Sequence, residues 1–211
     1  MKLRFSEVRQ RFHRRDIFGI RALELTGGSF YAVTGQNGSG KSTLIKLAGG
    51  LLRPTVGEIR RMDGDETRCD WQDETAMVTP ELSFYPRLTA RENLVFFLGL
   101  RGISVTEERM AEIFREVGLE GMETSSVRTA SFSTGMRQRL KLAVLFAAEA
   151  KLWLLDEPAA NLDGEGKELL LERVRQAKEK GSLILWATND DGEAQRADAK
   201  IHIADGMARL S

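Results

Sequence analysis

The chain has 211 residues, of which 42% are hydrophobic and 29% are charged, so it is long enough to bury a sizeable core. Lys plus Arg and Asp plus Glu both number 31, and this balance argues against nucleic acid as a partner. The single cysteine, Cys69, excludes an internal disulfide, and the absence of a signal peptide or a long apolar stretch predicts a cytoplasmic protein that needs a separate partner for any membrane role.

Strand patterns come first along the chain. Leu3-Arg4-Phe5 alternates apolar and polar residues, and residues 29–34 read as a short buried strand that leads into a glycine-rich turn. A helix with apolar periodicity follows from about Lys41. Further apolar strands are predicted at residues 76–78, 152–155 and 183–187. Helical patterns lie between these strands, which indicates an α/β sheet with flanking helices.

The segment from about residue 89 to residue 149 is predicted to contain helices only. Thr89 and Glu92 are spaced as a capping box, in which each residue bonds the backbone N–H of the other. The predicted helices cover residues 93–100, residues 107–117 and a stretch after Gly135. We therefore expect one domain: a core of residues 1–88 and 150–211, with antiparallel N-terminal strands, and an inserted helical lobe of residues 89–149.

A phosphate loop is predicted between the strand at 29–34 and the following helix. Residues 35–42 fit the pattern G-x-x-x-x-G-K-S, in which glycine dihedrals aim successive backbone N–H groups at phosphate oxygens. In that geometry Lys41 reaches the β- and γ-phosphates, and the Ser42 hydroxyl ligates Mg²⁺. A chance glycine turn is the alternative, which the flanking strand and helix disfavour. The predicted ATP-binding residues here are Gly35, Gln36, Asn37, Gly38, Ser39, Gly40, Lys41, Ser42 and Thr43.

Two acids follow the apolar strand at residues 152–155. Asp156 and Glu157 would stand at the edge where open α/β sheets bind ligands. Asp156 is placed to hold Mg²⁺, directly or through water, and Glu157 can polarise the water that attacks a phosphate. Acids that end a strand are also common on protein surfaces, but the preceding phosphate loop favours the catalytic interpretation.

Residues 132–136 read Phe-Ser-Thr-Gly-Met, which resembles the signature of ABC transporter ATPases, usually Leu-Ser-Gly-Gly-Gln. By itself such a turn would be ordinary helix capping. The resemblance covers nearly the whole chain and implies a phosphate-loop NTPase core with an inserted helical lobe. It also implies that Ser133, Gly135 and Met136 contact ATP on a second ATPase subunit. The further implication is an ATP-driven motor that energises an integral membrane permease from the inner face of the cell membrane.

The same resemblance assigns two further segments. An aromatic about two dozen residues before the phosphate loop stacks on adenine in this family, which implies that role for Phe12. A core aromatic at the end of a strand is an equally good interpretation of Phe12. Residues 160–163 look like the loop that communicates between the two sites of a dimer.

Two positions depart from the family pattern. Pro80 stands where the family carries a glutamine that ligates metal and couples the helical lobe to the core. Asn189 replaces a histidine that contacts the γ-phosphate, and an asparagine can donate a hydrogen bond but cannot become charged. We expect Asn189 to act with Lys41 and Glu157 as a catalytic residue, and hydrolysis to be slow but real.

The signature and residues 88–94 resemble the short ATPases of exporters, among them the haem exporter ATPase of cytochrome c maturation. Two alternatives stay open. One is a regulatory ABC subunit with impaired hydrolysis, motivated by Pro80 and Asn189, and the other is a soluble ABC ATPase without a transport role. The sequence does not identify the transported substrate, the direction of transport, or whether the two ATPase subunits are identical.

Overall fold

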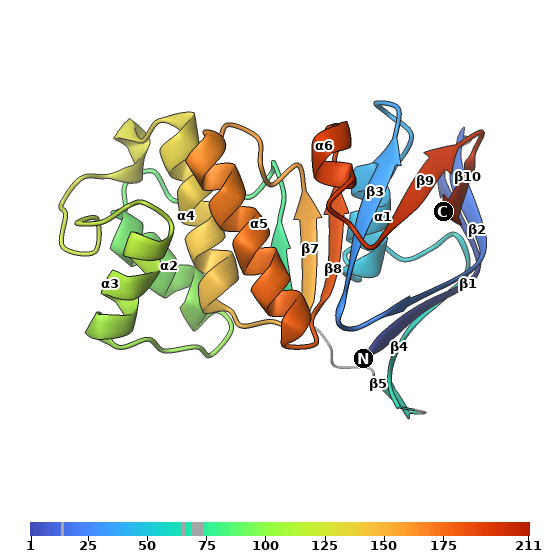
Figure 1. Ribbon diagram of the computed structural model, residues 1–211, viewed down its shortest axis with the longest axis horizontal. Helices are drawn as coiled ribbons and strands as arrows, with labels where there is room; N and C mark the ends of the chain where they lie inside the picture. The colour runs from blue at the N-terminus through green and yellow to red at the C-terminus, as the bar shows by residue number, and fades with distance from the viewer. Residues whose placement is uncertain (14, 65, 69–73) are drawn as a thin grey trace. The chain divides into compact units, whose positions relative to one another are not determined.

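A computed structural model describes residues 1–13, 15–64, 66–68 and 74–211 (Figure 1). Cys69 lies outside the described residues. The strands are β1 (Lys2–Phe12), β2 (Arg15–Thr26), β3 (Ser29–Gly35), β4 (Val56–Asp63), β5 (Glu66–Arg68), β6 (Thr75–Val78), β7 (Leu152–Asp156), β8 (Leu183–Ala187), β9 (Ala199–Ala204) and β10 (Met207–Leu210). The helices are α1 (Lys41–Ala48), α2 (Ala90–Gly99), α3 (Glu107–Glu116), α4 (Thr134–Ala147), α5 (Gly164–Glu179) and α6 (Asp191–Ala194), with a 3₁₀ turn, η1 (Thr129–Ser131).

These strands form one mixed sheet in the order β5-β4-β1-β2-β10-β9-β3-β8-β7-β6. β3 pairs in parallel with β8 and β9, and β7 pairs in parallel with β8. β1 pairs antiparallel with β2 and β4. Each apolar run that the sequence marked as a strand is present, as β3, β6, β7 and β8. The predicted α/β fold class is therefore confirmed.

The chain divides into two compact units. The first comprises residues 1–77, 150–157 and 176–211, and the second comprises residues 78–149 and 158–175. The second unit therefore holds more of the chain than the expected lobe at 89–149, and that functional division stays a prediction.

The core of the first unit forms between α1 and the sheet. Leu44, Ile45 and Leu47 of α1 are fully buried with side chains of the parallel strands, among them Val33 and Leu185. The spacing of these residues places them on one face of a helix. β7 and β8 are buried along their whole length, which is typical of parallel strands covered on both faces.

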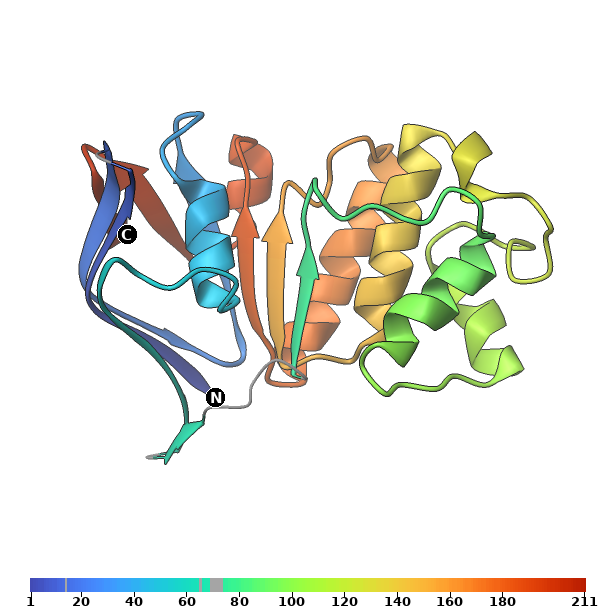
Figure 2. The same cartoon turned by 180° about the vertical axis from the view of Figure 1, so that it is seen from behind.

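The parallel strands also decide where loops of the first unit gather. β3, β7 and β8 run in the same direction, and the segments that follow them emerge at one edge of the sheet, as Figures 1 and 2 show. The turn after β3 leads into α1 and the turn after β8 leads into α6. This edge is where α/β sheets place their binding residues.

The second unit contains α2, α3, α4 and most of α5. α2 begins at Ala90, three residues before the predicted start, because Thr89 is its N-cap. The capping box is confirmed: the Thr89 hydroxyl accepts from the Glu92 N–H at 3.2 Å, and the Glu92 carboxylate accepts from the Thr89 N–H at 2.8 Å. The fully buried Asn93 amide then fixes the preceding loop, because its oxygen accepts from the Tyr85 N–H at 2.8 Å.

Within the described ranges, none of the helices combines the length and the apolar character needed to span a membrane.

Candidate functional site

The loop between β3 and α1 depends on glycine at both ends. Gly35 has φ of 145°, and a Cβ added there would lie 2.5 Å from the carbonyl oxygen of Ile203. Gly40 has φ of 110°, and its added Cβ would lie 2.7 Å from side-chain atoms of Ile17 and Phe18 on β2. Gly40 is also the N-cap of α1 and provides no side-chain cap. The first N–H groups of α1 are therefore suited to an anion.

Lys41 begins α1 and is only 7% exposed. Its Nζ donates to the carbonyl oxygens of Gly35 at 2.8 Å and Gln36 at 3.3 Å, and to Oδ1 of Asn189 at 2.8 Å. All three acceptors are neutral. A phosphate oxygen would bring a charge-assisted hydrogen bond, which is roughly twice as strong as a neutral one. The loop thus holds the ammonium ready to exchange acceptors with an anion.

The two acids lie where the sequence predicted them, at the end of β7. Asp156 is 4% exposed and pairs with Ala187 in the sheet. Glu157 follows with φ of 49°, a conformation that non-glycine residues seldom adopt, and its N–H donates to the carbonyl oxygen of Ala187 at 2.9 Å. Such backbone strain is found at functional sites. The sheet therefore fixes the direction in which the Glu157 carboxylate leaves the backbone.

Asn189 joins Lys41 to Glu157. Its Oδ1 accepts from Lys41 Nζ at 2.8 Å, and its Nδ2 donates to Oε1 of Glu157 at 2.6 Å. An asparagine can make both contacts because its amide carries an acceptor and a donor. The three predicted catalytic residues are thus brought together by segments that follow β3, β7 and β8.

The surroundings of Glu157 favour its protonated form. Burial raises the pKa of the Glu157 carboxyl, as do the charges of Asp156 and Glu193, while Lys41 and the bond from Asn189 oppose the shift. Glu193 is held in place by the Thr188 hydroxyl, which donates to its carboxylate at 2.6 Å. A carboxylate with a raised pKa is a better proton acceptor near neutral pH.

Oxygen donors for a metal lie at both sides of this site. Ser42 exposes its hydroxyl in the first turn of α1, and Asp156 offers a carboxylate at the end of β7. Hydroxyl and carboxylate oxygens fit Mg²⁺, which keeps few protein ligands and takes others from water and phosphate. Among the residues that the structure describes, no cluster of three or more His, Cys, Asp or Glu side chains could hold a metal.

Phe12 ends β1 at a hairpin beside the phosphate loop. Its side chain is 41% exposed, so it is not a core aromatic. Phe12 pairs with Arg15, and two residues further along β2 Ile17 approaches Gly40. An exposed ring at this place suits a flat ligand.

The signature residues lie in the second unit, at the start of α4. Ser133 is the N-cap, and its hydroxyl accepts from the Met136 N–H at 3.1 Å. A Cβ added to Gly135 would lie 3.1 Å from the carbonyl oxygen of Asn161, in the loop after Glu157. Ser133 is exposed and Phe132 is buried. The predicted signature is thus an exposed helix N-terminus with a buried anchor.

Sequence reasoning missed two residues on α4. Gln138 and Lys141 are buried, and both contact loop carbonyl oxygens in the second unit. Their signal was present: polar residues three positions apart on the apolar face of a helix.

Comparison with protein families matches residues 21–160 to the ABC transporter family. The cytochrome c biogenesis ATP-binding export protein CcmA of Sodalis glossinidius (strain morsitans) is 33% identical over 184 residues, which cover 86% of each chain. The linearmycin resistance ATP-binding protein LnrL of Bacillus subtilis (strain 168) is 28% identical over 96% of this chain and 66% of its own. A solved ATP binding subunit of an ABC transporter has a TM-score of 0.87 and 27% identity, covering 100% of this chain and 90% of its own.

The raised pKa of Glu157 predicts a pH-dependent effect on stability. Above about pH 4.3 the unfolded glutamate loses its proton first, so the free energy of unfolding falls as pH rises toward the folded pKa. Glu157→Gln removes this loss. We expect urea unfolding to show the variant gaining stability over wild type as pH rises above about 4.3, with the exposed Glu165→Gln as control. A difference that stays constant with pH would contradict the assignment.

Proposed function

The chain belongs to the ABC transporter family as an ATP-binding and ATP-hydrolysing subunit, and from this premise we propose which residues perform each step. The observation that carries the proposal is the hydrogen-bonded chain from Lys41 through Asn189 to Glu157. It links the group that would bind phosphate to the group that would activate water.

ATP binds with its phosphates over the loop of residues 35–43. Glycines at 35, 38 and 40 take positive φ values, and the N-terminus of α1 supplies N–H donors. Lys41 releases neutral carbonyl oxygens and donates to the β- and γ-phosphate oxygens instead. Phe12 offers the face of its ring to adenine.

Mg²⁺ would be held by the Ser42 hydroxyl and by Asp156, directly or through water. When bound, it neutralises charge that develops on the phosphate oxygens. Asp156 is buried at the end of β7 and Ser42 is fixed in the first turn of α1, so neither depends on a loop for its position.

Glu157 acts as general base for hydrolysis. Its raised pKa suits it to take a proton from the attacking water, and the left-handed backbone fixes where the carboxylate starts. Asn189 orients one carboxylate oxygen through the 2.6 Å bond from its amide. Because an amide does not titrate, Asn189 itself offers the same donor at any pH at which the protein folds.

A second ATPase subunit completes each site. Ser133, Gly135 and Met136 begin α4, and the positive end of this helix suits the γ-phosphate of ATP bound to the partner. A solved dimer of the ATP-binding cassette MJ0796, bound to ADP and Pi, supports this arrangement; it has a TM-score of 0.85 and 24% identity. Closure of the dimer would drive an integral membrane permease at the inner face of the cell membrane.

The similarity to CcmA supports a role in export, with haem of cytochrome c maturation as the candidate cargo. A regulatory subunit with impaired hydrolysis is a second candidate function. It is favoured by Pro80 and Asn189, which stand where the family carries a glutamine and a histidine.

We predict that Glu157→Gln binds MgATP without hydrolysing it and accumulates as an ATP-dependent dimer. The amide keeps the size of the side chain but cannot accept the proton from water. Light scattering with and without MgATP measures the dimer, and phosphate release measures turnover. Turnover equal to that of wild type would mean that another group is the base.

Ser133→Arg should abolish the dimer that Glu157→Gln accumulates. The long charged side chain would occupy the space proposed for the opposing γ-phosphate. Ser131→Arg is the matched control, since Ser131 is exposed on the preceding 3₁₀ turn. Dimerisation that survives Ser133→Arg, or that Ser131→Arg abolishes equally, would count against the proposed interface.

Asn189→His should raise basal phosphate release at saturating MgATP, because the imidazole can contact the γ-phosphate. One positioning hydrogen bond is worth on the order of 10²-fold in rate, of which Asn189 already supplies part. The gain should vary between about pH 5.5 and pH 7.5 as the imidazole titrates. Glu157→Gln is the blank. If wild type and Asn189→His both release phosphate no faster than this blank, the regulatory function is supported over hydrolysis.

A further inference from the structure

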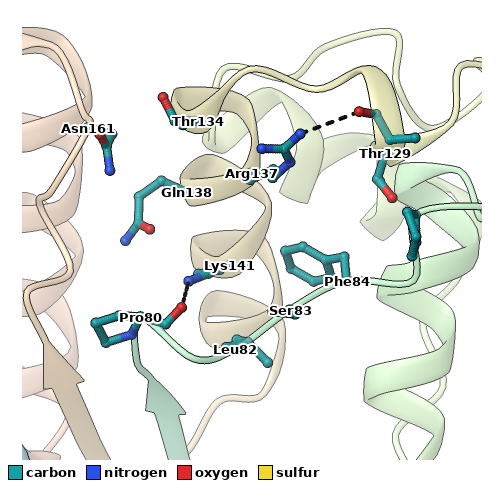
Figure 3. A pocket seen from close by; sticks show the side chains of 12 residues that line it. Pro80, Leu82, Ser83, Phe84, Thr129, Thr134, Arg137, Gln138, Lys141 and Asn161 are labelled. Carbon is teal, nitrogen blue, oxygen red and sulfur yellow. Dashed lines mark hydrogen bonds between the residues drawn. The ribbon is translucent and has the colours of Figure 1, made fainter.

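Two polar side chains interrupt the buried face of α4. Gln138 is 7% exposed and Lys141 is 8% exposed, whereas the neighbouring Leu140 and Leu142 are fully buried. Both polar residues also line a pocket of about 510 Å³ in the second unit. Figure 3 shows them one turn apart on the same side of α4. The hydrogen bonds of Gln138 and Lys141 therefore identify the segments that this face of α4 holds in place.

Gln138 and Lys141 hold two segments that follow neighbouring strands. Gln138 Nε2 donates to the carbonyl oxygen of Pro158, the residue directly after Glu157, at 2.5 Å. Lys141 Nζ donates to the carbonyl oxygen of Thr79 at 2.8 Å. It also donates to the carbonyl oxygen of Pro80 at 3.2 Å, as Figure 3 shows. Thr79 directly follows β6, and β6 is the neighbour of β7 in the sheet. One helix thus bonds the chain after each of these strands.

A lysine at position 141 costs desolvation free energy, because its side chain is buried. Burial lowers the pKa of its ammonium from the usual value, and the charge of Glu81 only partly opposes this shift. An apolar side chain would avoid the desolvation, as Leu140 and Leu142 do. It would also remove the lysine donor from the Thr79 and Pro80 carbonyl oxygens. Desolvation of a charge is tolerated where the charge is used.

Pro80, in the loop after β6, cannot itself bond to α4 as a donor. Pro80 has no backbone N–H and an apolar ring, so neither its backbone nor its side chain can donate a hydrogen bond. The backbone turn is closed by the Leu82 N–H, which donates to the Thr79 carbonyl oxygen at 3.2 Å. Lys141 shares that same oxygen. The position of the loop relative to α4 is therefore set from the helix side.

We propose that Lys141 is a positioning residue for ATP hydrolysis. It fixes residues 79–82 to α4, the helix that begins after Ser133. Gln138 fixes the same helix to Pro158, the residue after Glu157. Movement of α4 is thereby transmitted to Thr79 and Pro80 after β6 and to Pro158 after Glu157. Because Lys141 acts through the loop that it bonds, its loss changes the rate of the chemical step and leaves nucleotide affinity unchanged. This inference rests on the proposed role of Glu157.

The test compares Lys141→Met, which keeps the length of the apolar stem, with Lys141→Arg, which keeps a charged donor. Phosphate release against MgATP concentration gives kcat and KM. We expect Lys141→Met to lower kcat by on the order of 10-fold, with KM within about twofold of wild type, because a positioning contact is lost. Lys141→Arg should keep more than about half of the wild-type kcat.

Leu140→Ala is the matched control, since it truncates a fully buried side chain of the same helix and keeps the Lys141 donor. It should lower the unfolding temperature but keep kcat below that temperature. The proposal is overturned if Lys141→Met keeps a kcat within twofold of wild type, if Leu140→Ala lowers kcat as much, or if Lys141→Arg is as slow as Lys141→Met.

Amide hydrogen exchange without nucleotide separates this proposal from the role of Glu157. Exchange at the Leu82 N–H should be roughly 10-fold faster in Lys141→Met than in wild type, because the turn loses its bond to α4. In Leu140→Ala the exchange rate at the Leu82 N–H should equal that of wild type. Unchanged exchange at Leu82 in Lys141→Met would overturn the proposal even where Glu157→Gln behaves as predicted. If Glu157→Gln hydrolyses ATP as fast as wild type, the assignment of Glu157 as general base is wrong.

Discussion

The nucleotide site depends on one buried cation, the Lys41 ammonium, and on the carbonyl oxygens that hold it. Gly35 and Gln36 supply backbone acceptors from the end of β3, and Asn189 supplies a side-chain acceptor from the end of β8. A buried polar group without hydrogen-bond partners costs free energy, so these acceptors hold the Lys41 side chain in place before any phosphate arrives. ATP binding is then an exchange of weaker partners for stronger ones.

Asn189 couples the hydrogen bonds of Lys41 to the position of Glu157. While the amide oxygen of Asn189 is bound to Lys41, its Nδ2 holds the carboxylate, so the phosphate-binding and water-activating groups share one side chain. A histidine could exchange one proton between its two nitrogens, whereas an amide keeps a fixed donor and a fixed acceptor. Asparagine in place of histidine therefore loses the ability to become charged but keeps the direction of both hydrogen bonds. Lys141 has a comparable place in the second unit, where a donor from α4 holds a loop whose Pro80 has none.

Local patterns predicted the parts of the fold and site that depend on residues near each other in the chain. The glycine loop before Lys41, the capping box of Thr89 and the strand that ends in Asp156 could all be read from the sequence. The bond from Lys41 to Asn189 spans 148 residues, and that from Lys141 to Thr79 spans 62. No periodicity encodes such pairs, because the sheet order and helix packing create them. A polar residue on an apolar face, as at Lys141, is the only local sign.

The affinity for MgATP tests most directly the claim that Lys41 is the cation that the site is built to hold. Calorimetric titration should compare wild type with Lys41→Met and with Lys46→Met, which changes a lysine in the last turn of the same helix. Lys41→Met should weaken binding by at least about 100-fold, since charge-assisted bonds to two phosphates are lost, and Lys46→Met should bind like wild type. An affinity of Lys41→Met within about threefold of wild type would contradict the account.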